Sequence, residues 1–152
     1  MSANDTLGEL VYDARLQIVD TVEHGASLQS VLTGQVVFPL PGLRVDFIFE
    51  GVLEGRVAGE IRGVDYVLIR PDGGAELDIR ATVTTSDGIK IALSANGVTI
   101  PRPDSTVSTI REGIRLTTAS EAYRWVNCLH LVGIGTTDIA TGSIEVRAYA
   151  PE

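Results

Sequence analysis

The chain has 152 residues, 44% of them hydrophobic, and its 20 acidic and 12 basic side chains give a formal net charge of −8. This length predicts a single domain over residues 1–152 with a sizeable core, and the hydrophobic fraction argues against general disorder. The acidic surplus, without any basic run, excludes an electrostatic footprint for nucleic acid or an anionic membrane surface. No apolar run approaches the ~20 residues of a membrane-spanning helix.

The start of the chain, MSANDTLGEL, is polar and acidic and lacks the pattern of a secretory leader, so a cytoplasmic protein is expected. Residues 1–8 are expected to be a disordered or loosely held N-terminus. Cys128 is the only cysteine, so it cannot form an intrachain disulfide, and His24 and His130 are the only histidines. No paired Cys or His ligands for zinc can be written. A carboxylate-rich magnesium or calcium site stays open, although no stretch has the spacing of a calcium loop, and the prediction is that the protein uses neither a metal nor another cofactor.

Apolar and polar residues alternate along much of the chain and are interrupted by glycine, which is typical of strands and turns. The first such segment places Leu10, Tyr12, Ala14, Leu16 and Ile18 on one face. The predicted strands are 9–19, 31–38, 44–53, 56–62, 64–70, 76–85, 89–95, 107–117, 124–133 and 142–149.

Turn residues divide these strands. Asp87-Gly88 lies between two strand-like runs and predicts a hairpin, because both positions can adopt positive φ. Residues 70–74, RPDGG, predict another turn, and residues 99–106 predict a loop or strand end. Little helix is expected beyond a short turn at 117–124. About eight to ten short strands with sixteen glycines favour an all-β fold, a single antiparallel barrel that closes on itself.

Three segments carry a family pattern: GVDYVLIRPDGGAELDIRATVTTSDGIKI (63–91), AYRWVN (122–127) and IEVRAYAP (144–151). They resemble the small bacterial and fungal proteins of the family called domain of unknown function 3237. The matching positions are Gly63, Asp65, Tyr66, Asp72, Gly73, Leu77, Asp78, Arg80, Thr85, Asp87, Gly88, Tyr123, Trp125 and Asn127. The resemblance implies a β-barrel, calycin-like or allene-oxide-cyclase-like, with a small-molecule pocket and no agreed chemistry.

Two segments depart from the family pattern, FPLPGLRVDFIFEG (38–51) and TVSTIREGIRLTT (106–118). They replace a glycine-pair and phenylalanine segment and a Tyr-Phe-Arg-Thr segment, respectively. Both are expected to border the pocket, so the ligand or reaction is expected to differ from that of typical members.

Asp78 and Arg80 share one strand face, opposite Leu77 and Ile79. If this face points outward, the pair is an exposed ion pair of at most about 1 kcal/mol. If it points into the barrel, Arg80 can hold a developing anion and Asp78 can act as a base. The family pattern includes this pair, and we predict it as the catalytic pair.

Tyr123, Trp125 and Asn127 occupy alternate positions of the predicted strand 124–133 and its approach. In one interpretation, Trp125 plugs an end of the barrel while Tyr123 and Asn127 satisfy loop backbone groups. In the other, which we favour, the three line the pocket and bind substrate. Asp65 and Tyr66 are added as substrate-binding residues, although Asp65 is also placed to cap a turn.

Three functions are consistent with this pattern. The first, which we favour, is a cofactor-independent enzyme doing acid–base chemistry, of lyase, isomerase, hydratase or cyclase type, on a small apolar or aromatic carbonyl compound. The second is a non-catalytic carrier of a small hydrophobic ligand, and the third is a structural module. Two or more ionisable groups around an apolar lumen would favour the enzyme. A homodimer or higher homo-oligomer is expected, because apolar side chains are left on the outer face.

Overall fold

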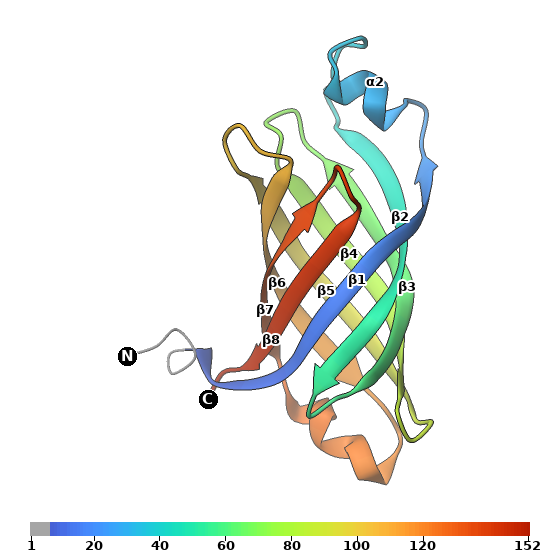
Figure 1. Cartoon of the computed structure of the whole chain (residues 1–152), viewed down its shortest axis with the longest axis vertical. Helices are drawn as coiled ribbons and strands as arrows, with labels where there is room; N and C mark the ends of the chain where they lie inside the picture. Colours follow the sequence, from blue (N-terminus) through green and yellow to red (C-terminus); the bar gives the residue numbers. More distant parts are fainter. Residues whose placement is uncertain (1–6) are drawn as a thin grey trace.

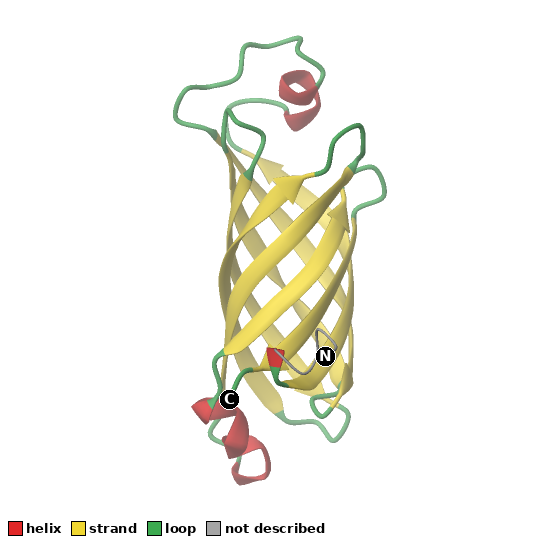
Figure 2. Ribbon diagram, turned by 90° about the vertical axis from the view of Figure 1, so that its left-hand side faces the viewer, coloured by secondary structure: helices red, strands yellow, loops and turns green. Residues whose placement is uncertain are grey.

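The protein is a closed antiparallel barrel in which each strand pairs with the next along the chain and the last returns to the first (Figures 1 and 2). The computed structural model describes residues 7–152, so most of the expectation for residues 1–8 lies outside the described part. The strands are β1 (Glu9–Glu23), β2 (Leu43–Gly55), β3 (Gly59–Ile69), β4 (Ala75–Thr85), β5 (Lys90–Pro101), β6 (Val107–Thr117), β7 (Leu131–Asp138) and β8 (Ser143–Ala150). The predicted all-β barrel is confirmed.

Two short helical segments mark the opposite ends of the barrel (Figure 1). Helix α2 (Leu28–Leu32) lies between β1 and β2, and the 3-10 helix η1 (Glu121–Cys128) lies between β6 and β7. Because the strands alternate in direction, the loops 70–74, 102–106 and 139–142 lie at the same end as α2. We call the two ends the α2 end and the η1 end.

Both predicted turns are present, although at Asp87-Gly88 only the glycine adopts the positive φ that was expected of both residues. At Asp87-Gly88 the chain reverses between β4 and β5, with Gly88 at φ +89° and its N–H donating to the Thr85 carbonyl at 2.9 Å. At 70–74 the Arg70 N–H donates to the Gly74 carbonyl at 2.8 Å. Positive φ costs glycine little, which explains its place in such turns.

The predicted strand 31–38 is wrong. Its first residues end α2, and the rest forms a loop in which Val37 is 89% exposed. Ser27 caps α2 by accepting the Ser30 N–H at 3.3 Å. This β-branched run has no neighbouring strand to pair with, because β1 and β2 already pair with each other below it.

The predicted strand 124–133 is also wrong in its first half, where the chain forms η1. Asn127 folds this segment back onto the end of β6: its side chain accepts the Thr118 N–H and donates to the Thr118 carbonyl, both at 2.8 Å. Residues 56–62 and 64–70, predicted as two strands, belong to a loop and the single strand β3.

The interior is filled at the η1 end and hollow toward the α2 end. The side chains that close the η1 end are apolar and nearly inaccessible to solvent: Val11, Leu53, Val57, Val83, Ile91, Leu116, Val126 and Leu131. Close packing of the wall itself requires glycine in places. At Gly51 a Cβ would lie 2.1 Å from the Arg15 carbonyl oxygen of the neighbouring strand β1.

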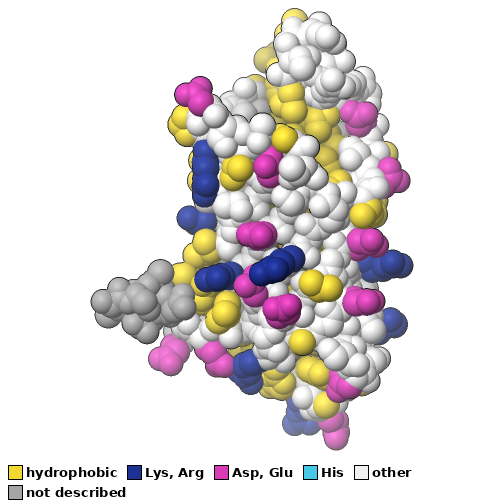
Figure 3. All heavy atoms as spheres, in the orientation of Figure 1, with side chains coloured by type: hydrophobic (Ala, Val, Ile, Leu, Met, Phe, Trp, Pro, Cys, Tyr) yellow, Lys and Arg dark blue, Asp and Glu magenta, His cyan; other side chains and the backbone are white. Residues whose placement is uncertain are grey.

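The outer wall carries acidic and basic side chains interspersed over the face in view (Figure 3). Within residues 7–152 no helix is long and apolar enough to span a membrane.

Candidate functional site

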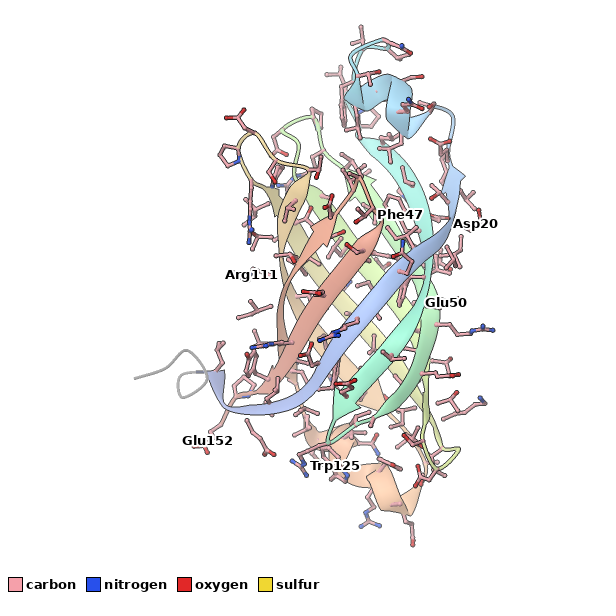
Figure 4. The ribbon with its side chains drawn as sticks, viewed as in Figure 1. Asp20, Phe47, Glu50, Arg111, Trp125 and Glu152 are labelled. Carbon is pink, nitrogen blue, oxygen red and sulfur yellow. The ribbon has the colours of Figure 1, made fainter. Side chains whose placement is uncertain are left out.

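A cavity of about 290 Å³ occupies the barrel interior toward the α2 end. This volume is at the small end of the roughly 300–1,000 Å³ of ligand pockets. Its walls are mainly apolar side chains from β1 to β4, among them Leu16, Phe47, Phe49, Val67, Leu77 and Ile79. Phe47 lies in the half of the barrel nearer α2, far from Trp125 at the η1 end (Figure 4). The cavity extends to the α2-end loops, because Leu32, Gly73 and Ile139 also line it.

Hydroxyl groups line one side of this cavity near the α2 end. They come from β5, β6, β7 and the loop before β6: Thr99, Ser105, Thr106, Ser108 and Thr137. The cavity is therefore mainly apolar, with hydroxyl-bearing residues near its α2 end.

Asp65 projects from the inward face of β3 into the cavity, between Gly63 and Val67 on the same face. Its Oδ1 accepts a hydrogen bond of 3.1 Å from the backbone N–H of Asp78 on β4. Burial raises the pKa of Asp65 to about 7, against the lowering effect of that N–H, and the nearby Asp78 charge raises it further. The group can therefore exchange a proton near neutral pH.

Glu112 projects into the same cavity from β6, on the face that also carries Ile110 and Ile114. Its Oε2 is buried and has no hydrogen-bond partner among the described residues. Burial, and second the charge of Asp65, raise the pKa of Glu112 to about 7. The charge of Asp65 thus acts on Glu112, while the pKa of Asp65 is set by its own burial and by Asp78.

Gly133 on β7 makes room for the Glu112 side chain. A Cβ at this position would lie 2.7 Å from Glu112 Cγ and 2.9 Å from Ile114 Cδ1. Carbon atoms do not approach so closely, so any larger residue would displace the carboxyl group. The glycine thus helps fix where Glu112 lies.

Tyr12, on β1, is the third ionisable group that lines the cavity, and it is only 3% exposed. Burial, and then the charge of Glu112, raise the pKa of its phenol well above the ordinary value. The phenol therefore stays protonated and can donate a hydrogen bond. Tyr12, Asp65 and Glu112 come from strands that are not neighbours, so they approach the cavity from three parts of the wall.

The prediction that Asp78 and Arg80 lie in the lumen is wrong. Their side chains are 49% and 67% exposed on the outer face of β4, with Arg80 Nε 3.5 Å from Asp78 Oδ1. The alternation places Leu77 and Ile79 of the same strand in the cavity instead. Asp78 contributes to the site through its backbone N–H, which holds Asp65.

The placement of Tyr123, Trp125 and Asn127 in the pocket is wrong as well, because all three belong to η1. Tyr123 donates its hydroxyl to Asp87 Oδ1 at 2.8 Å, and Arg56 covers the Trp125 ring with its guanidinium 4.0 Å from the ring centroid. Asn127 makes two hydrogen bonds with the Thr118 backbone, as described above. Of the other interpretation, the part on Asn127 agrees with its bonds to the Thr118 backbone, whereas Tyr123 bonds a side chain. The fully buried side chain of η1 is that of Val126, and Trp125 packs partly buried beside it.

Of the predicted site residues, Asp65 is the one that lines the cavity. Tyr66, next to it, is 39% exposed on the outer face of β3. Glu112 and Tyr12 were not predicted, although Glu112 lies in the segment 106–118 that departs from the family pattern. A signal for Glu112 exists in the sequence: it is an acid on the same strand face as Ile110, Ile114 and Leu116.

In the described part of the chain, no group of three or more His, Cys, Asp or Glu side chains is arranged to hold a metal ion. Asp65 and Glu112 are two carboxyl groups without a third such ligand.

Fold and interior together define a closed β-barrel with an apolar, small-molecule-sized cavity that contains two buried carboxyl groups. The chain belongs to the DUF3237 family, described as "Protein of unknown function", whose sequence model matches residues 9–150. No curated protein matches the chain significantly.

Three solved structures show the same fold at low sequence identity. A protein with unknown function from Clostridium acetobutylicum ATCC 824 aligns with a TM-score of 0.76 at 19% identity, over 95% of this chain and 98% of its own. A beta-barrel like protein from Acinetobacter baumannii AYE aligns with a TM-score of 0.73 at 19% identity, over 95% and 94%. A structure described as an enzyme from Penicillium herquei aligns with a TM-score of 0.60 at 17% identity, over 92% and 91%.

Proposed function

We propose that the protein is an enzyme that uses its own carboxyl groups for acid–base chemistry on a small, largely apolar carbonyl compound. The observation that carries this proposal is the presence of both Asp65 and Glu112 in a mainly apolar cavity. Acid–base catalysis is most effective when the pKa of the catalytic group lies near the working pH. Burial brings both carboxyl groups to that range.

The surroundings of the two carboxyl groups give them different roles. The Asp78 N–H donates to Asp65, and such a bond favours the ionised form, so Asp65 is the base. Glu112 has an oxygen without a partner and lies near the charge of Asp65, which favours its protonated form, so Glu112 is the proton donor. With one proton on the pair, the site can remove a proton from one ligand atom and deliver one to another.

A carbonyl substrate fits these roles. Asp65 would take the proton from the carbon beside the carbonyl group. Glu112 or the Tyr12 phenol would donate a hydrogen bond or a proton to the oxygen on which negative charge develops. The apolar wall would bind the rest of the compound. Such a step occurs in lyase, isomerase, hydratase and cyclase reactions that pass through an enol or enolate, and a distant structure of the same fold is described as an enzyme.

Deuterium exchange tests this function without knowledge of the natural product. A mixture of small cyclic and aryl ketones in D₂O would be followed by NMR for loss of the protons beside the carbonyl group. The expected result is exchange above the buffer rate with the wild-type protein, reduced by at least about 100-fold in Asp65→Asn, in line with the 10²–10⁴-fold contribution of a general base. Glu50→Gln, an outer-wall acid, is the matched control and should keep the activity.

A ketone that binds in the cavity without any enhanced exchange in the wild-type protein would contradict the proposal. That result would favour the second candidate, a carrier of a small hydrophobic ligand. The observation behind this candidate is the predominance of apolar side chains in the cavity wall.

A further inference from the structure

The cavity contains negative charge and lacks a positive partner for it. Asp65 and Glu112 both line it, whereas none of the described residues that line it is Lys, Arg or His. Arg111, the neighbour of Glu112 in the sequence, is exposed and lies on the outer wall of the barrel (Figure 4). Buried charges in proteins are ordinarily paired with a charge of opposite sign. Here the described residues that line the cavity supply no such cation.

Glu112 shows where such a cation would bind. Its Oε2 is buried without a hydrogen-bond partner, although the residue borders the cavity. A carboxylate and an ammonium group form a charge-assisted hydrogen bond, about twice as strong as a neutral one. The rings of Tyr12, Phe47 and Phe49 also line the cavity and can attract a cation to their faces.

We propose that the cavity selects ligands in which an apolar or aromatic body carries a basic nitrogen, and that their ammonium group pairs with Glu112. In this complex the ammonium takes the place of the proton that Glu112 otherwise holds. An aliphatic amine has a pKa near that of lysine, about 10.4, so it stays charged beside a carboxylate. Asp65, held by the Asp78 N–H, remains available as a base. The inference uses the carboxyl pair of the proposed function and adds the charge class of the ligand.

The same charges disfavour anionic compounds. A ligand carboxylate or phosphate would meet two carboxyl groups in a low-dielectric cavity without a basic residue to offset the repulsion. An uncharged ligand of the same shape would keep only the apolar contacts and a neutral hydrogen bond. The expected order of affinity is therefore amine, then alcohol, then carboxylate.

Isothermal titration calorimetry at pH 7 with benzylamine, benzyl alcohol and benzoate tests this order with three ligands of similar shape. We expect benzylamine to bind about tenfold more tightly than benzyl alcohol, the effect of one hydrogen bond to a charged group. Titrations in buffers of different ionisation enthalpy should show about one proton released per benzylamine bound and none for the alcohol.

Glu112→Gln, which keeps the shape of the side chain, should lower the benzylamine affinity to that of the alcohol and abolish the proton release. The control Glu50→Gln, on the outer wall, should change neither value. Equal affinities for amine and alcohol in the wild-type protein, or a benzylamine affinity that Glu112→Gln leaves unchanged, would overturn the inference. Ketone exchange distinguishes the two proposals: it would persist if only the charge class is wrong, and amine selectivity would persist if only the catalytic function is wrong.

Discussion

Gly133 leaves the space that the Glu112 side chain occupies. Gly133→Ala places a Cβ 2.7 Å from Glu112 Cγ and 2.9 Å from Ile114 Cδ1, so Glu112 must move. We expect this variant to fold but to lose the benzylamine preference as fully as Glu112→Gln does. Calorimetry with benzylamine and benzyl alcohol measures the preference.

The matched control is Gly113→Ala, on the outer face of β6. A Cβ at this position would point away from Glu112 and lie 3.0 Å from Nε2 of His130. The His130 side chain is exposed and can move into solvent. This variant should keep the preference. An unchanged amine preference in Gly133→Ala would show that the position of Glu112 does not matter for binding.

The sequence contained enough information to locate Asp65 and Glu112 but not to rank them. Each is an acid on an otherwise apolar strand face, Asp65 with Ile61 and Val67, and Glu112 with Ile110 and Ile114. The family pattern favoured Asp78 and Arg80 instead, whose partners on their own face are polar. A shared motif does not distinguish an exposed ion pair from a site. The unpartnered Glu112 oxygen and the space that Gly133 leaves for this side chain depend on how segments far apart in the sequence pack together. Only the structure reveals them.

At the scale of elements, the strands followed from the period-two pattern, and the errors lie where segments leave the sheet. In η1, alternate Tyr123, Trp125 and Asn127 imitate a strand face, yet their contacts are with Asp87, Arg56 and Thr118 of loops and strand ends. Local pattern cannot reveal such long-range partners. The run at 36–38 likewise has strand propensity but no strand to pair with.

We expect η1 to act as a plug that stabilises the barrel and takes no part in ligand selection. Trp125→Ala should lower the free energy of unfolding by about 2 kcal/mol, because the ring is only partly buried and a fully buried one would cost more. Urea unfolding measures this loss. Benzylamine affinity should stay within about twofold of wild type; a large loss of affinity without a loss of stability would place η1 at the site after all.

At the scale of the whole molecule, the carboxyl pair makes stability depend on pH in an unusual direction. The folded-state pKa values of Asp65 and Glu112, about 7, lie above the ordinary values of 3.8 and 4.5. The folded protein therefore binds more protons than the unfolded chain in this range. The contribution of the pair is fully present below about pH 4 and is lost as the pH rises to about 7.

Asp65→Asn and Glu112→Gln should therefore raise the free energy of unfolding at pH 8, by up to a few kcal/mol for the pair, and change it little at pH 4. The asparagine oxygen can still accept the Asp78 N–H, so the fold keeps this bond. Urea titrations at both pH values measure the difference. Variants that are destabilised equally at pH 4 and pH 8 would contradict the account.

Other carboxyl groups oppose this trend at lower pH. Hydrogen bonds, and for Asp72 also the charge of Arg70, hold the pKa values of Asp72 and Asp87 below the ordinary value, so their contribution to stability is lost as the pH falls below about 4.

The formation of a homodimer or higher homo-oligomer stays a prediction, which light scattering would test. The outer wall offers Val19, Val22, Val52 and Tyr66 as exposed apolar side chains that a second copy would cover.

The central claim is that Asp65 and Glu112 are two buried carboxyl groups in the cavity that exchange protons near neutral pH, and that the charge of Asp65 raises the pKa of Glu112. The direct test is a pH titration of the ligand-free protein with ¹³C-labelled aspartate and glutamate side chains, observed by NMR and assigned with Asp65→Asn and Glu112→Gln. We predict two carboxyl signals that titrate near pH 7, each lost in one variant, and a lower pKa for Glu112 once the Asp65 charge is removed. Titration of every carboxyl group below about pH 5, the range of ordinary Asp and Glu side chains, would contradict the claim.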